Sequence, residues 1–143
     1  MRIGTSHGPG WFSVAVQALV VLAESDAPCP SSVMAQDLKS HAVHVRRVLA
    51  QLVRAHLIQA REGRAGGYRL ARSADQITLA EVYQAVAVAD PAEHPAGAGG
   101  VNARVQGVLD GIGAEAEDYL LELLSHHTLA SVVKRVASEG RPS

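Results

Sequence analysis

Cysteine and aromatic residues are both scarce in this chain of 143 residues. It holds one cysteine (Cys29), one tryptophan, one phenylalanine and three tyrosines. A single cysteine excludes an internal disulfide, which is typical of a protein in the reducing cytoplasm. Because aromatic side chains are so few, we expect the hydrophobic core to be built from Val, Leu, Ile and Ala.

Long hydrophobic runs are absent as well. The longest apolar stretch covers residues 18–23, well short of the roughly 18 consecutive apolar residues of a membrane span. The first ten residues lack the basic-then-apolar layout of a signal peptide. We therefore expect no membrane partner and a cytoplasmic location.

The signatures of catalysis and of metal binding are missing too. The sequence has no nucleophile elbow, no paired catalytic carboxylates and no cofactor fingerprint, so we do not expect an enzyme. Among the seven histidines, His126 and His127 are adjacent and would point in different directions on a helix. No carboxylate completes a ligand set with any of the histidines. The sequence thus predicts neither a metal nor a cofactor.

Positive charge is abundant in only one part of the chain. Residues 1–75 carry nine Lys or Arg and five Asp or Glu, whereas residues 76–143 carry four and nine. Between Lys39 and Arg72, eight cations accompany one anion, Glu62. Such a local excess indicates a polyanionic partner. The alternative is a solvated surface without a partner.

Apolar periodicity predicts three helices in the first half of the chain, over residues 11–24, 31–38 and 42–56. Ser31 or Ser32 is expected to cap the second helix and Ser40 the third. The third helix shows mostly His, Arg and Gln opposite its apolar stripe. That composition suits contact with a wet, negatively charged surface.

A β-ribbon and further helices follow. Short strands are expected over residues 57–61 and 68–72, around a Gly-rich loop. Thr78 and Glu81 form a capping box that begins a fourth helix. A long amphipathic helix is expected from about residue 102 to residue 125, and Thr128 is expected to cap a last short helix.

The order of these elements predicts a mainly α fold with a small β-ribbon. Three helices followed by a ribbon form a winged helix-turn-helix, in which the third helix enters the major groove of DNA. We assign this domain to residues 1–89 and a flexible connector to residues 90–101. Residues 102–143 are expected to form a helical dimerisation region, although the long helix could instead fold back on its own domain.

The sequence of these elements resembles one family of bacterial regulators. Residues 43–58, the segment Gly66-Gly67-Tyr68-Arg69-Leu70-Ala71-Arg72 and the following Ile77-Thr78-Leu79 are similar to the Rrf-type family that includes IscR, NsrR and CymR. The resemblance covers residues 11–88 strongly and the C-terminal helices weakly. It implies a cytoplasmic homodimer that binds double-stranded DNA at a near-palindromic operator and usually represses transcription.

The chain departs from this family at the connector. Iron–sulfur members carry three cysteines there, and residues 90–102 of this chain contain none. Thiolates are the expected cluster ligands, and the distant Cys29 cannot replace three of them. The resemblance is therefore to the cysteine-poor, YwnA-like branch of the family.

Candidate DNA-binding residues lie near the start of the third helix and in the loop of the ribbon. Arginine can bond guanine edges or phosphates, and a valine can touch a thymine methyl group. The alternative for each arginine is a solvated side chain. The candidates are His41, Val43, His44, Arg46, Arg47 and Arg64.

Two further hypotheses concern regulation and partner. Cys29 lies between two prolines and is a candidate redox switch that would act through a disulfide across the dimer, although a lone cysteine is more often inert. A groove between the winged domain and the dimerisation helix is a place for a small-molecule effector. The alternative function is a winged-helix protein-interaction module that does not bind DNA.

Overall fold

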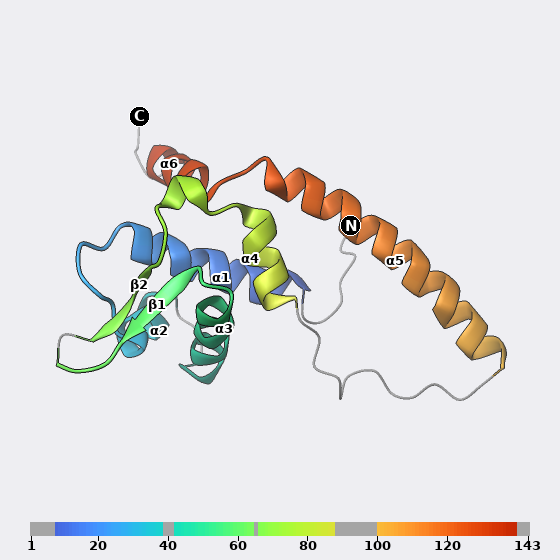
Figure 1. The fold of residues 1–143 in the computed structure, drawn as a ribbon, viewed down its shortest axis with the longest axis horizontal. Coiled ribbons are helices and arrows are strands. Elements are labelled where there is room, and N and C mark those ends of the chain that lie inside the picture. Colours follow the sequence, from blue (N-terminus) through green and yellow to red (C-terminus); the bar gives the residue numbers. More distant parts are fainter. Residues whose placement is uncertain (1–7, 39–41, 65, 88–99, 140–143) are drawn as a thin grey trace.

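The structure is a computed structural model that describes residues 8–38, 42–64, 66–87 and 100–139 (Figure 1). It confirms the predicted fold class, because the described chain is mainly helical with a two-stranded antiparallel ribbon. In chain order the elements are α1 (Gly8–Ala23), α2 (Ser31–Asp37), α3 (Ala42–Arg54), β1 (Ile58–Arg61), β2 (Gly67–Leu70), the 3₁₀ turn η1 (Ala74–Gln76), α4 (Leu79–Val86), α5 (Val101–Ser125) and α6 (Leu129–Glu139).

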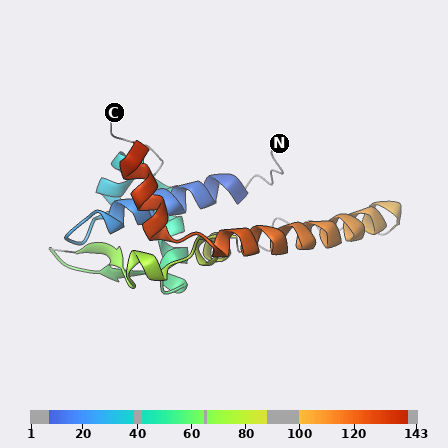
Figure 2. The same ribbon diagram turned by 90° about the horizontal axis from the view of Figure 1, so that it is seen from above.

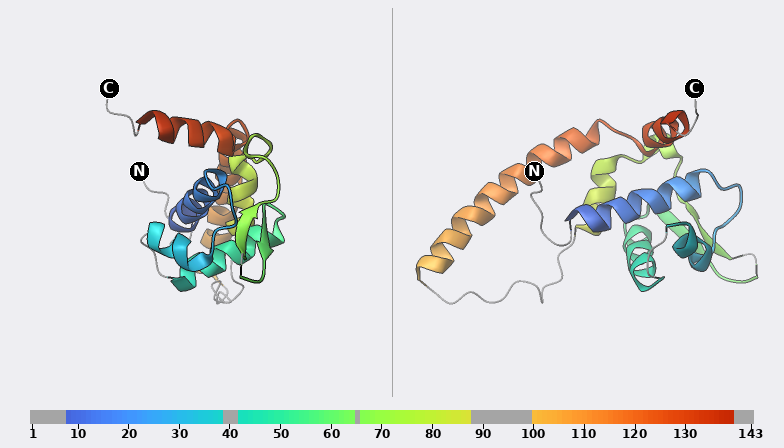
Figure 3. Two further views of the ribbon diagram at one scale, coloured as in Figure 1. Left: turned by 90° about the vertical axis from the view of Figure 1, so that its left-hand side faces the viewer. Right: turned by 180° about the vertical axis from the view of Figure 1, so that it is seen from behind.

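The hydrophobic core lies where α1 packs against α3 and α4 (Figures 1 and 3). It is aliphatic, as predicted, apart from Met34 and Cys29. Among the described residues no aromatic side chain is fully buried; Trp11, Phe12 and Tyr68 are half-buried and pack against the core from outside. The core therefore depends on close packing of small branched side chains.

Helix α3 ends two residues earlier than predicted because His56 adopts a left-handed conformation with φ of 60°. The backbone N–H of Leu57 then donates to the carbonyl of Leu52 at 3.0 Å and that of His56 to Val53 at 3.0 Å. These bonds satisfy carbonyls that the helix end leaves open. They also turn the chain directly into β1.

The ribbon is fixed to the turn between α1 and α2. Strands β1 and β2 pair with Ile58 opposite Leu70 and Arg61 opposite Gly67. Cys29 and Tyr68 exchange two backbone hydrogen bonds of 2.9 Å. Gly67 has φ of 151°, and a Cβ there would lie 2.6 Å from the carbonyl carbon of Cys29. Only glycine permits this approach of the ribbon to the helical layer.

The predicted caps have different outcomes. The capping box of α4 is confirmed: Glu81 N donates to Thr78 Oγ1 at 3.2 Å, and Thr78 N donates to Glu81 Oε1 at 3.3 Å. Thr128 caps α6 in the same way, with Ser131 N donating to Thr128 Oγ1 at 3.2 Å. The prediction for α2 is wrong, since its N-cap is Pro30 and no side chain bonds there. Ser40 lies outside the described residues.

The two C-terminal helices behave differently (Figure 2). Helix α5 extends far beyond the winged-helix part, and none of its residues is buried. Helix α6 packs on α1 and η1, and Leu129 at its start is fully buried. Backbone bonds join Leu79 N to His127 O at 2.9 Å and Leu129 N to Ile77 O at 2.8 Å. The division into residues 1–89, 90–101 and 102–143 stays a prediction, and most of the connector lies outside the described residues.

None of the described helices combines the length and the apolar character needed to cross a membrane.

Candidate nucleic-acid interface

Helix α3 has one buried and one exposed face. Val45, Val48, Leu49 and Leu52 have no exposed surface. Because residues three and four apart share a helix face, these side chains commit one side of α3 to the core. The opposite side is exposed and carries Val43, His44, Arg46, Arg47 and Arg54.

The structure brings most of the predicted site residues together. Val43 is 74% exposed, and His44, Arg46 and Arg47 are exposed beside it in the first half of α3. Arg64 is exposed in the loop between β1 and β2. Helix α3 and the ribbon project to the same side of α1, away from α6 (Figures 1 and 3). His41 lies outside the described residues.

The ribbon exposes the arginines Arg61, Arg64 and Arg69. Arg69 Nε donates to Gln59 Oε1 at 3.3 Å across the two strands. Arg72 differs from them, because its guanidinium pairs with Glu81 at 2.6 Å. Because Glu81 neutralises Arg72, the positive charge at the surface is smaller than the cation count of residues 39–72 indicates.

Glu81 is held in its charged form by this contact. Burial alone would raise the pKa of the Glu81 carboxyl. Hydrogen bonds from Arg72 and Thr78, together with the charge of Arg72, outweigh burial and lower this pKa below its ordinary value. The ion pair fixes the start of α4 against the segment that follows the ribbon.

The sequence did not predict the contacts that Trp11 makes with two residues of the candidate interface. The Arg47 guanidinium carbon lies 5.5 Å from the centroid of the Trp11 ring. The His44 ring meets the same indole edge-on, with centroids 5.4 Å apart and an interplanar angle of 67°. The cluster of Trp11, His44 and Arg47 cannot be predicted from the spacing of residues in the sequence, because it depends on how the start of α1 crosses α3.

Cys29 is nearly buried, with 7% of its surface exposed, and its Sγ lies 3.7 Å from the carbonyl oxygen of Pro30. Reactive thiols are at least partly accessible and stand in electropositive surroundings. A disulfide across a dimer would require local opening where Gly67 covers the Cys29 backbone. The redox role of Cys29 stays a prediction.

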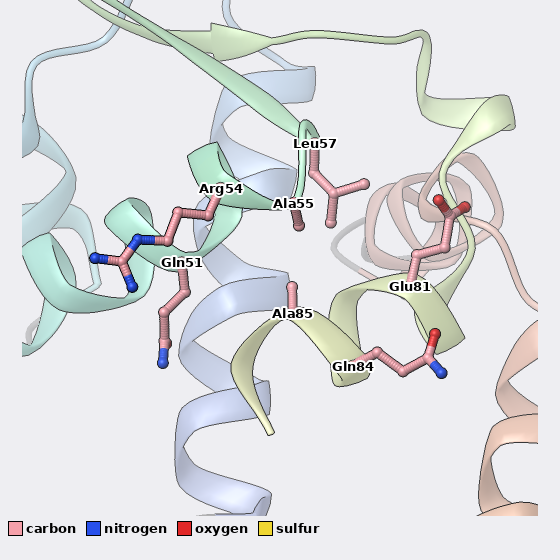
Figure 4. Close-up of a pocket in the computed structure, with 7 residues that line it drawn as sticks. All are labelled: Gln51, Arg54, Ala55, Leu57, Glu81, Gln84 and Ala85. Atoms are coloured by element: carbon pink, nitrogen blue, oxygen red, sulfur yellow. The ribbon is translucent and has the colours of Figure 1, made fainter. Parts of the chain in front are cut away.

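A pocket of about 430 Å³ lies between the end of α3 and α4 (Figure 4). Gln51, Arg54 and Ala55 line one side of the pocket, and Glu81, Gln84 and Ala85 of α4 line the other. The Gln51 Oε1 atom is buried and has no hydrogen-bond partner among the described residues. A second hollow, of about 360 Å³, lies on α5 alone and is lined by Val101, Arg104, Val105, Val108 and Leu109.

A metal site in a protein needs several ligand side chains close together. Within the described ranges, no three His, Cys, Asp or Glu side chains converge on one point. The whole sequence contains one cysteine. A thiolate-held iron–sulfur cluster takes about four protein ligands, most of them cysteines, so the residues of this chain do not fit one.

The fold is shared with several solved structures. IscR of T. potens superimposes with a TM-score of 0.70 at 19% identity, over 100% of this chain and 93% of that chain. CymR of B. subtilis gives a TM-score of 0.64 at 18% identity, over 94% and 98%. The oxidised form of CymR from Staphylococcus aureus gives 0.63 at 17% identity, over 93% and 96%. No curated protein matches the sequence.

The sequence also matches a family as a whole. Residues 11–135 match the Rrf2 family, described as "Iron-dependent Transcriptional regulator". The iron of that description has no fitting set of cysteine ligands here, whereas the winged helix, the exposed arginines of α3 and the ribbon all fit the regulator. The chain belongs to the Rrf2 family and is a DNA-binding transcriptional regulator rather than an enzyme.

Proposed function

We propose that this protein is a cytoplasmic repressor that binds a near-palindromic operator as a homodimer. The observation that carries the proposal is the exposed face of α3, which bears three arginines and a histidine on the side of the molecule where the ribbon also projects. Such a face matches the shape and charge of the major groove.

Each candidate residue has a distinct role in this proposal. Arg46 and Arg47 read base edges, where a guanidinium can bond guanine through two N–H groups. Val43 contacts a thymine methyl group, and His41 and His44 contact the DNA beside it. Arg64, in the loop of the ribbon, binds the backbone or a minor groove.

Dimerisation is assigned to α5 in the region of residues 102–143. Its apolar side chains are exposed along one stripe of the helix, whereas Leu121 and Leu124 near its C-terminal end are half-buried. A second copy can bury the stripe symmetrically and place two α3 helices on two half-sites. The stripe comprises Val101, Val105, Val108, Leu109, Ile112, Tyr119, Leu120 and Leu123, which are all exposed.

A small-molecule effector completes the proposal. The sequence suggested a groove between the winged domain and the dimerisation helix, but we assign the effector to the pocket between α3 and α4, which lies within the winged domain. The unpartnered Gln51 Oε1 would accept a hydrogen bond from such a molecule. Because Gln51 belongs to α3 itself, occupancy of the pocket would act directly on the DNA-binding helix. Thermal stabilisation by candidate metabolites, abolished in Gln51→Leu, is the expected result.

Salt dependence separates this function from a protein-interaction module. We would measure fluorescence anisotropy with DNA from upstream of the protein's own gene, across a salt series. A DNA-binding protein loses affinity steeply as salt rises, because bound phosphates release counterions. Affinity no better than for random DNA would leave two explanations, an operator elsewhere or the interaction module, and binding with little dependence on salt would favour the module.

A pair of variants assigns the contact. Arg47→Ala is expected to weaken operator binding by about 1–3 kcal/mol if Arg47 reads a base. Arg54→Ala removes the same charge from the far end of the exposed face of α3 and is the matched control. Equal losses in both variants would show a general charge effect and would remove the base-reading role of Arg47.

A further inference from the structure

We propose that Trp11 is a positioning residue for DNA readout, which holds the side chains of Arg47 and His44 in place on the exposed face of α3. The proposal rests on the DNA-binding function proposed above. It extends the interface to the first helix, which bears none of the predicted contacts.

The geometry places one indole under two candidate DNA contacts. Trp11 is half-buried, and its contact with the core restrains its ring. Arg47 lies over the ring at 5.5 Å, and His44 meets it edge-on at 5.4 Å. Residues 44 and 47 are three positions apart and share a helix face, so a single ring can reach both.

Stacking on the indole does not itself use the N–H donors that read a base. Stacking uses the flat face of the guanidinium, whereas its N–H donors lie in the plane and point outward from the edge. An arginine can therefore rest on an indole and still bond the O6 and N7 atoms of guanine. The indole and the base would hold two different parts of one side chain.

Restraint of Arg47 is expected to raise both affinity and discrimination. A long exposed side chain loses rotamer freedom when it binds, and a side chain already held in place loses less. Fixing the guanidinium in one orientation also favours one base over the others. A stack that withheld Arg47 from DNA would have the opposite effect, so tighter binding by Trp11→Ala would contradict the proposal.

The contact can be tested without DNA, because Trp11 is the single tryptophan of the chain. The emission of the free protein therefore reports on this one ring. Arg47→Ala and His44→Ala are expected to change its intensity or wavelength, whereas Arg54→Ala, whose residue lies at the far end of α3, is expected to leave it unchanged. Emission identical to wild type in both contact variants would overturn the proposal.

The effect on readout is measured with labelled DNA. Trp11→Ala is expected to weaken operator binding roughly two- to fivefold, the range of an exposed cation–π contact. It is also expected to reduce discrimination against an operator in which the base pair read by Arg47 is replaced. Trp11→Phe keeps a ring under Arg47 and is expected to retain most of both properties. In an Arg47→Ala background, Trp11→Ala is expected to add almost no further loss of discrimination.

Phe12→Ala is the matched control for a merely structural role. Phe12 is the next residue of α1 and is also half-buried, but its ring meets Tyr83 of α4 at 5.8 Å and 65°. This variant is expected to lower the free energy of unfolding without changing base discrimination. Equal affinity losses in Trp11→Ala and Phe12→Ala with discrimination intact would overturn the proposal, as would tighter binding by Trp11→Ala.

DNA binding by the wild-type protein distinguishes failure of the proposed function from failure of the role of Trp11. If wild type does not prefer the operator to random DNA, the proposed function fails and the role of Trp11 falls with it. If wild type does prefer the operator and Trp11→Ala behaves like wild type, only the role of Trp11 is lost.

Discussion

Helices α3 and α5 are both amphipathic, yet the fold uses them in opposite ways. In α3 the apolar stripe has no exposed surface, and the polar face points to solvent. In α5 the apolar stripe is exposed throughout, and Tyr119 is 75% exposed. Folding thus covers the apolar stripe of α3 and leaves the apolar stripe of α5 exposed.

The contrast shows how a partner can be inferred for each helix. The face that folding leaves unused is the face that remains for binding, so α3 offers cations to a polyanion and α5 offers apolar area to a second apolar surface. Helix α4 packs against both helices and connects the two surfaces. The burial of Tyr83 on α4 and the nearby charge of Glu117 on α5 both raise the pKa of the Tyr83 hydroxyl, in keeping with this contact.

The largest expected effect comes from charging the stripe of α5. Val108→Asp combined with Ile112→Asp places two carboxylates on the face assigned to dimerisation. Operator affinity is expected to fall by about 10²–10⁴-fold, because two half-sites are no longer held by one particle. Sedimentation velocity and anisotropy on the same samples would show whether both properties are lost together.

The control for this variant adds the same charges elsewhere on α5. Ala103 and Ala114 are exposed but lie off the apolar stripe, so Ala103→Asp with Ala114→Asp is expected to remain dimeric. If both double variants dissociate, net charge rather than the stripe governs association.

A second pair of variants compares equivalent leucines on the two helices. Leu49→Ala empties a fully buried site in α3 and is expected to lower the free energy of unfolding by about 2–5 kcal/mol. Leu109→Ala removes a side chain that is 54% exposed in the subunit, so its cost is expected to appear in the dimer dissociation constant. Urea unfolding at several protein concentrations checks this: dilution should abolish the effect of Leu109→Ala and preserve that of Leu49→Ala.

DNA binding by the exposed face of α3 is expected to depend on a ribbon that is fixed in place. Gly67→Ala forces a Cβ against the Cys29 carbonyl and is expected to cost about 1–3 kcal/mol in strain and displacement. The ribbon should loosen, DNA affinity should fall, and alkylation of the Cys29 thiol by iodoacetamide should become faster than in wild type.

Gly63→Ala is the matched control for the ribbon. Gly63 also has a positive φ, of 112°, but an added Cβ meets nothing within 4 Å. The strain is therefore comparable, whereas the displacement is absent. Equal alkylation rates in the two variants would show that Gly67 does not protect Cys29. The ribbon would then not control access to the thiol, as the redox hypothesis requires.

Periodicity and local chemistry were enough to predict the elements from the sequence. The helices, the ribbon and the two threonine caps depend on neighbours within a few positions, which a single sequence displays. The cluster of Trp11, His44 and Arg47 could not be predicted, because it depends on the crossing of two helices. The pairing of Arg72 with Glu81 was missed for a similar reason, since the turn between them had to be folded first.

The smallest expected effect comes from the ion pair between Arg72 and Glu81 at the start of α4. The pKa of Glu81 is lowered in the folded protein, so the stabilisation by its charge is present above the ordinary glutamate pKa of about 4.3 and is lost as the pH falls through the lower folded value. Arg72 and Glu81 are 37% and 39% exposed, and solvent screening limits such a pair to about 0–1 kcal/mol. The difference in unfolding free energy between wild type and Glu81→Gln should therefore be small at pH 7 and shrink towards pH 3. Glu62→Gln, in the exposed loop of the ribbon, is the control for general charge removal. A difference for Glu81→Gln that stays constant over this range would show that the capping geometry of Glu81, rather than its ion pair, secures α4 between α3 and α5.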